Sequence, residues 1–263
     1  MTRSKPMLTN LLLSLSLLFG CQRASMPGKT YAVVIGISDY QALTYTTGDL
    51  RFADRDAQQV ATFLRSKAGG SVSNANIRLL TNRQATQETI QQALTLFRQA
   101  GPTDRVILYF SGHGLPDSFV PYDARPGDER KLLTYRVIKA AFHESNAKTK
   151  LCIADACMSG GITRQKTKRS ALATNEPDGS NVAMMLASRS TQRAVEDGRL
   201  AGGAFTYFLL KGLTGQGDVD GNGIVTIREL HKYVSPQVKK RTKGQQTPIF
   251  YGRFSDELPL SYL

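Results

Sequence analysis

The sequence predicts an α/β domain in which helices cover both faces of a mostly parallel sheet. Tyr31 to Ile37 and Val106 to Phe110 are continuous apolar runs rich in β-branched or aromatic residues, which are typical of strands buried on both faces. Helical patterns alternate with such runs, and this order favours parallel strands joined by crossover helices. The 263 residues, 41% of them hydrophobic, are sufficient for one domain with a sizeable core.

The expected elements follow from hydrophobic spacing and from turn residues. Strands are predicted at Tyr31 to Ile37, Ile77 to Leu80, Arg105 to Phe110, Phe119 to Tyr122, Lys150 to Ile153 and Val182 to Leu186. Helices are predicted over Leu50 to Lys67, Thr86 to Gly101, Tyr135 to His143, Phe205 to Leu213 and Ile227 to Val234, the last closed by Pro236. In such folds ligands bind at the carboxyl ends of the strands, so the site residues are expected there.

The first twenty residues have the pattern of a secretion signal, with Arg3 and Lys5 followed by an apolar run from Met7 to Gly20. This run is shorter than the roughly 18 to 20 apolar residues that a spanning helix needs, which favours a cleaved signal. Leu18 to Cys21 resembles the bacterial lipobox, which implies that Cys21 is lipidated and that the protein is extracytoplasmic, on the periplasmic face or the cell surface. An ordinary secretory signal with an incidental cysteine is the alternative. Residues 21–30 are then a tether, and residues 31–263 the folded domain.

The net charge of +13, or +11 once Arg3 and Lys5 leave with the signal, suits an anionic surface such as phospholipid or cell-wall polymer. Nucleic acid is an unlikely partner, because the chain lacks Trp and has no run of aromatics among its basic residues. Cys152 and Cys157 are expected to stay unpaired thiols, and no spacing typical of a zinc site occurs.

A histidine and a cysteine each follow a predicted strand in a glycine-rich turn. His113 lies in Ser111 to Gly114, and Cys157 lies in Asp155 to Gly161. A cysteine is a good nucleophile only as a thiolate, and an imidazole is its usual activating partner. Alone, each residue would have a structural interpretation, a small buried side chain or a hydrogen-bonded histidine. Together they predict a cysteine nucleophile with a histidine acid/base.

These motifs resemble the caspase and metacaspase-like cysteine peptidases over roughly Tyr31 to Val234. The matching segments, in order, are Tyr31 to Tyr40, Ala53 to Ala57, Phe110 to Gly114, Val120 to Ala124, Asp155 to Gly161 and Gly203 to Gly212. The resemblance implies a three-layer sandwich around a mainly parallel six-stranded sheet. It also implies that Cys157 attacks the scissile carbonyl, that His113 transfers the proton, and that the backbone N–H groups of Cys157 and Gly114 hold the oxyanion.

The resemblance also implies a preference at the cleaved bond. Asp155 stands two residues before Cys157, where caspases have Gln, and this departure is shared with metacaspase-like members. An acidic pocket favours Arg or Lys before the cleaved bond. Asp56 matches the second acidic position and Glu196 is a third candidate, although Asp56 and Asp155 can also be explained as ordinary structural carboxylates. A basic-specific enzyme could cut itself in the loop from Ile162 to Asn181, which is otherwise an exposed linker.

The segment 218–229 fits the twelve-residue EF-hand calcium loop, with a glycine at its sixth position. Side-chain oxygens would come from Asp218, Asp220, Asn222 and Glu229, a carbonyl from Ile224, and Thr226 would act directly or through water. Such loops usually work in pairs, so a glycine-rich turn without metal is the alternative.

The sequence therefore predicts a lipid-anchored cysteine endopeptidase that cleaves after Arg or Lys. No cofactor is expected for catalysis, with Ca²⁺ as a modulator. Two alternatives stay open, a membrane-tethered binding module that has lost activity, and a protein that binds polyanions through its positive surface.

Overall fold

The computed structural model describes residues 28–44, 48–115, 117–156, 182–188, 196–252 and 254–263. Predictions that concern the signal segment, Cys21, most of the tether, Cys157 and the loop from Ile162 to Asn181 lie outside the described residues. Among the described residues, no helix combines the length and the apolar character that crossing a membrane would need.

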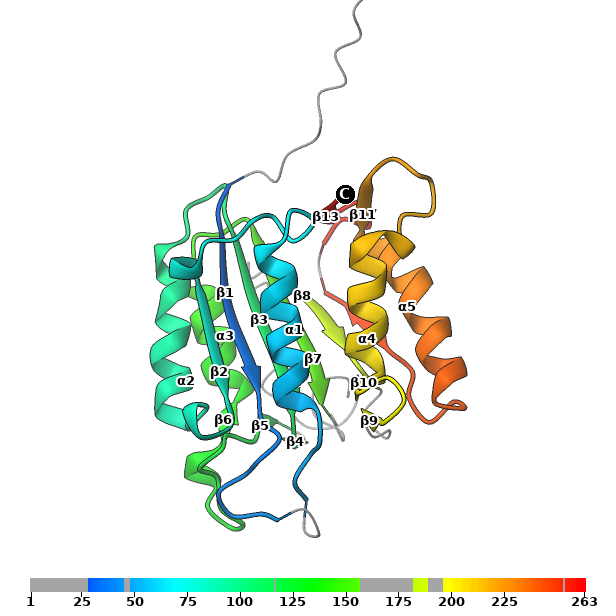
Figure 1. Ribbon diagram of the computed structural model, residues 1–263. Coiled ribbons are helices and arrows are strands. Elements are labelled where there is room, and N and C mark those ends of the chain that lie inside the picture. The colour runs from blue at the N-terminus through cyan, green and yellow to red at the C-terminus, as the bar shows by residue number, and fades with distance from the viewer. Residues whose placement is uncertain (1–27, 45–47, 116, 157–181, 189–195, 253) are drawn as a thin grey trace, which may run out of the picture.

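A six-stranded sheet forms the centre of the domain (Figure 1), with the strand order β12-β8-β7-β3-β1-β2. Its strands are β1 (Thr30–Gly36), β2 (Ile77–Thr81), β3 (Arg105–Gly112), β7 (Thr149–Ala156), β8 (Val182–Leu186) and β12 (Ile249–Tyr251). Five strands run parallel, and β12 pairs antiparallel with β8 at the edge. The predicted fold class, with its mainly parallel six-stranded sheet, is confirmed.

Helices cover both faces of this sheet. They are α1 (Ala53–Arg65), α2 (Gln87–Leu94), α3 (Tyr135–His143), α4 (Ala204–Lys211) and α5 (Ile227–Arg241). Short helical turns lie at Asn74–Asn76, Asn82–Gln84, Thr95–Gln99, Glu129–Lys131 and Gly212–Gln216. Alternate residues of β3 enter different cores: Leu108 and Phe110 pack with α2 and α3, whereas Ile107 and Tyr109 pack with α1, α4 and α5. This two-sided burial explains why the strands are almost continuously apolar.

Three small sheets complete the fold. They are β4 (Gly114–Leu115) with β5 (Ser118–Phe119) and β6 (Leu133–Thr134), β9 (Glu196–Asp197) with β10 (Gly202–Gly203), and β11 (Ile224–Thr226) with β13 (Pro259–Tyr262). The strand predicted over Phe119 to Tyr122 is therefore largely wrong, because only Phe119 of that range is in a strand. Its apolar residues Phe119 and Val120 are explained by packing against the core beneath α3.

The predicted end of the last helix at Pro236 is also wrong, because α5 continues to Arg241. A proline inside a helix removes one backbone hydrogen bond to the carbonyl four residues earlier. Pro236 is exposed, so it lies on the side of α5 where water can satisfy that carbonyl. Burial of Val234 and Val238 on the opposite side holds the helix against the sheet across the proline.

Candidate active site

The two predicted catalytic motifs follow the carboxyl ends of β3 and β7, so they lie at the same side of the domain, which we call the carboxyl edge of the sheet. The strands are parallel neighbours, and Gly112, the residue before His113, pairs with Ala156, the residue before Cys157. Cys157 itself lies outside the described residues, so its pairing with the imidazole stays a prediction. Cys152, four residues before Ala156, is a buried free thiol, and burial raises its pKa.

Two contacts orient His113. Its backbone N–H donates to the hydroxyl of Tyr40 at 2.7 Å, and the two rings lie 5.0 Å apart between centroids. Its Nε2 forms a short hydrogen bond with the carbonyl oxygen of Gly48. Because a carbonyl can only accept, Nε2 carries the proton and Nδ1 is the atom free to act as a base in the neutral ring.

The glycine before His113 is required by close packing. A Cβ at Gly112 would lie 2.7 Å from the Tyr40 hydroxyl and about as close to the ring of Phe110. Tyr40 is buried, which raises the pKa of its hydroxyl and keeps it neutral. The glycine therefore lets the hydroxyl approach and hold the backbone of His113.

Asp56 and Asp155, the two principal acids of the predicted pocket, lie together at the same edge. Asp56 is in the first turn of α1 and Asp155 is the second-last residue of β7, and they are only 2% and 5% exposed. A Cβ on Gly203 would lie 2.3 Å from Asp155 Oδ2 and 2.8 Å from Asp56 Oδ2. Only glycine fits between these carboxylates.

The start of α4 supplies hydrogen bonds to both acids. The N–H of Gly203 donates to the Asp56 carboxylate at 3.0 and 3.2 Å. The N–H and hydroxyl of Thr206 donate to Asp155 Oδ2 at 3.2 and 2.7 Å. The positive end of the α4 dipole favours negative charge here.

The pKa of Asp56 is nevertheless raised, first by burial and then by the charge of Asp155, against the hydrogen bond from Gly203. Burial also raises the pKa of Asp155, against its hydrogen bonds from Thr206. Two buried carboxylates this close cannot both ionise easily without a cation. The pair is therefore suited to a positively charged group that neutralises it.

Sequence reasoning missed the polar residues that hold this pair. Tyr109 and Thr206 share a buried hydrogen bond of 2.6 Å between their hydroxyls, which continues the chain from Asp155 into the core. Ser111 Oγ lies 3.5 Å from Asp56 Oδ2. Within the sequence, only Gly202-Gly203 directly before a helix signals that a backbone approaches another group closely here.

Glu196, the third predicted acid, reaches the same region from β9. Its carboxylate accepts the backbone N–H groups of Arg51 and Phe52 at 2.8 to 2.9 Å. These N–H groups belong to the two residues before α1, so Glu196 ties β9 to the segment that leads into the helix that carries Asp56. Its charge contributes to the raised pKa of Asp56 and of Asp155. The structure thus gathers all three acids, and their part in substrate binding stays a prediction.

Gly114, the other predicted oxyanion residue, begins β4 directly after His113 and pairs with Phe119 of β5. The carbonyl of His113 accepts the N–H of Val120 at 3.0 Å, which ties this turn to β5. The structure therefore fixes the backbone on both sides of the predicted acid/base. The oxyanion role of Gly114 stays a prediction.

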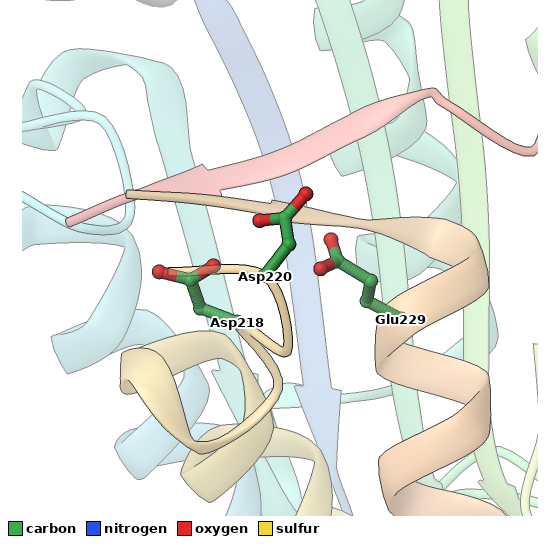
Figure 2. A group of neighbouring side chains, drawn as sticks. All are labelled: Asp218, Asp220 and Glu229. Carbon is green, nitrogen blue, oxygen red and sulfur yellow. The ribbon is translucent and has the colours of Figure 1, made fainter. Parts of the chain in front are cut away.

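The predicted calcium loop lies near the other end of the strands, where β1 and β3 begin. It connects the turn after α4 to the start of α5. Figure 2 shows Asp218, Asp220 and Glu229 facing a common space, and one carboxylate oxygen from each lies within 4.8 Å of the other two. Among the predicted ligands, Asn222 donates to Asp220 and accepts from the N–H of Ile224. Oxygen donors of this kind fit a hard cation such as Ca²⁺.

Glu229 has a second function in this loop. Its carboxylate accepts the N–H and hydroxyl of Thr226 at 3.0 and 2.8 Å, which forms a capping box at the start of α5. Partial burial opposes ionisation, but these bonds and the N–H of Val219 lower the pKa of Glu229 overall. β13 pairs with β11 in the second half of the loop, where a paired EF-hand would place the strand of its partner loop.

Comparisons with known proteins agree with this architecture. A family model described as "Caspase domain" matches residues 29–259. Protein GSU0716 from Geobacter sulfurreducens is similar in structure, with a TM-score of 0.58 and 19% identity over 86% of this chain and 95% of that chain. Caspase-1 from Spodoptera frugiperda has a TM-score of 0.61 and 11% identity over 87% of this chain and 88% of that chain. At these identities the two structures support the fold alone. No curated protein sequence is similar enough to count as a match.

Proposed function

Because the chain belongs to the caspase-domain family, we propose that it is a cysteine endopeptidase that cleaves after Arg or Lys and is anchored to a membrane through lipidated Cys21. Its substrate is a polypeptide, and it acts outside the cytoplasm. The observation that carries the preference is the buried pair Asp56 and Asp155 at the edge that also holds His113. A guanidinium or ammonium group beside them would relieve their repulsion.

In the proposed reaction, the thiolate of Cys157 attacks the scissile carbonyl and the carbon–nitrogen bond breaks. The imidazolium of His113 gives its proton to the leaving amine, and the neutral ring then takes a proton from the water that hydrolyses the acyl enzyme. The carbonyl of Gly48 supports this role, since it fixes the ring orientation and the tautomer. N–H groups of Gly114 and Cys157 stabilise the oxyanion.

The test uses fluorogenic peptides that end in Arg, Lys, Asp or Leu at the cleaved bond, with wild-type protein and Cys157→Ala. Cleavage after Arg and Lys only, lost in the variant, is the expected result. Tight binding of the Arg peptide without cleavage would support the inactive binding module instead. Cleavage after Asp would contradict the pocket assignment.

The lipid anchor is supported by the lipobox-like segment Leu18 to Cys21. Expression of the full chain in a bacterium with radiolabelled palmitate should label wild-type protein and leave Cys21→Ser unlabelled. Fractionation should place wild-type protein in the membrane fraction. A soluble, unlabelled wild-type protein would contradict the anchor and leave the peptidase proposal untouched.

We further propose that the loop 218–229 binds Ca²⁺. The convergence of Asp218, Asp220 and Glu229 supports this, as does the brace that β13 gives to the loop. Calcium is expected to raise the melting temperature, whereas magnesium raises it less because it requires a more rigid octahedral site. Asp220→Asn should remove the calcium effect, and Glu129→Gln, which neutralises an exposed carboxylate elsewhere, should keep it. An unchanged melting temperature in millimolar calcium would contradict binding.

A further inference from the structure

The proposed function leaves unexplained the lysines at the carboxyl end of α5 and just after it. Lys239, Lys240 and Lys243 are exposed, and no ion pair or hydrogen bond of their ammonium groups occurs within the described residues. We call these three side chains the basic helix end. The helix dipole favours cations at this position, but three unpaired cations within two turns also repel one another. Such a surface favours an anionic partner.

The basic helix end lies beside the acidic pair. Between its lysines, Arg241 donates from Nε to Asp197 Oδ2 at 2.6 Å, which joins α5 to β9. The next residue back along β9 is Glu196, which pairs with Gly203 of β10, and Gly203 in turn donates to Asp56. Figure 1 shows this end of α5 at the same edge of the domain as β9 and β10. Since Arg241 already neutralises Asp197, that carboxylate does not compensate the lysines.

We propose that the basic helix end binds acidic residues of the polypeptide substrate, several positions away from the Arg or Lys at the cleaved bond. This inference rests on the proposed peptidase function. Arg241, Asp197, Glu196 and Gly203 connect Lys240 to the acidic pair, so an acidic residue at the basic helix end would lie several positions from the Arg or Lys at the cleaved bond. Opposite charges on the two surfaces thus select a substrate with a basic cleavage site and an acidic flank.

Other anionic partners fit this surface less well. α5 buries its apolar residues, Ile227, Leu230, Val234 and Val238, in the core, so it has no apolar face to insert into a bilayer, and anionic lipid would bind these lysines through charge alone. No aromatic residue stands between Lys239 and Lys243 on which a nucleic-acid base could stack. An acidic peptide needs neither feature, and the acidic pair would already bind a basic residue of the same peptide.

The test compares two Arg peptides, one with neutral flanks and one with glutamates about five residues to either side of the cleaved bond. The protein variant carries Lys239→Gln, Lys240→Gln and Lys243→Gln, which remove the charge; glutamine also suits the two positions inside α5. Its matched control carries Lys29→Gln, Lys67→Gln and Lys148→Gln, three exposed lysines at the opposite edge of the sheet. A parallel arm measures binding of labelled peptides to Cys157→Ala protein with and without the same changes.

Wild-type protein should show a KM for the acid-flanked peptide that is lower by about 3- to 10-fold, and high salt should remove this advantage. The triple variant should lose it with kcat unchanged, and the control should keep it. Equal KM values for both peptides, or an equal loss in the control, would overturn the inference. Equally tight binding of a single-stranded oligonucleotide or of anionic vesicles at the same lysines would overturn it too. If neither peptide is cleaved, the peptidase proposal fails, and the binding arm still decides whether the lysines select acidic peptides.

Discussion

Two groups of acids lie at opposite ends of the strands and differ in their burial and in their hydrogen bonds. Asp56 and Asp155 are buried and bonded to the start of α4. Asp218 and Asp220 lie in a loop, where Asp218 is half-buried and Asp220 is exposed. Burial raises the pKa of both Asp56 and Asp155, so this pair favours a cationic side chain that has lost its water shell and is held in one position. The loop can exchange water for protein oxygens, which suits a hydrated metal ion. Burial therefore separates two sites that composition alone would not distinguish.

The largest effect is expected from Asp155→Asn. This change keeps the shape of the side chain but removes the charge opposite a substrate Arg or Lys. We expect kcat/KM for Arg and Lys peptides to fall by about 100- to 1,000-fold, because the substrate cation loses its buried partner. Glu129→Gln, at an exposed carboxylate, is the control for lost charge. Retention of more than a tenth of the activity would mean that the buried pair is structural and does not bind the cation of the substrate.

Gly203→Ala tests whether tight packing defines the buried pair. The added methyl group would overlap both carboxylates, so the free energy of unfolding should fall by about 1 to 3 kcal/mol. Gly198→Ala is a matched control in the same region, because nothing lies within 4 Å of a Cβ there and the change should cost less than about 0.5 kcal/mol. Urea unfolding of both variants provides the measurement. Similar stability of the two would show that the carboxylates can move apart without cost.

Thr206→Val sharpens the contrast by removing the hydroxyl that joins Asp155 to Tyr109. Thr206 acts here as a positioning residue. We expect KM for Arg peptides to rise by about 10-fold with little change in kcat, since one buried hydrogen bond to a charged group is lost. Thr206→Ser should restore KM. An equal fall in kcat for the valine and serine variants would point to general damage instead.

The smallest effect concerns pH. Both buried acids have a pKa above that of an unfolded Asp, so the folded protein holds their protons more tightly. Their contribution to stability is complete below the unfolded pKa and is lost as pH rises through the raised values. Wild-type protein should therefore lose about 1 kcal/mol more stability than Asp56→Asn between about pH 5 and pH 9. Denaturant unfolding across that range measures the difference, and parallel curves would contradict the raised pKa of Asp56.

Much of the fold could be predicted from the sequence because its signals are local. The apolar runs of β1, β3 and β8 mark the strands, and glycines mark the turn that carries His113. Other features depend on tertiary contacts. The fit of Gly203 between two carboxylates needs three segments far apart in the chain, and α5 passes Pro236 only because its other side is buried. The pairing of β11 with β13 likewise has no local signal.

Both described ends of the chain lie on the side of the domain where β1 and β3 begin, whereas His113 follows the other end of β3. Thr30 begins β1 beside Arg105, and the carbonyl of Leu260 in β13 accepts a hydrogen bond from Arg105. Figure 1 shows the start of β1 and the marked C-terminal end on this side of the domain. β3 then runs about 23 Å before it reaches Gly112. A sensor chip or bead coupled to either terminus would therefore hold the protein with its reactive edge turned toward the bulk solution.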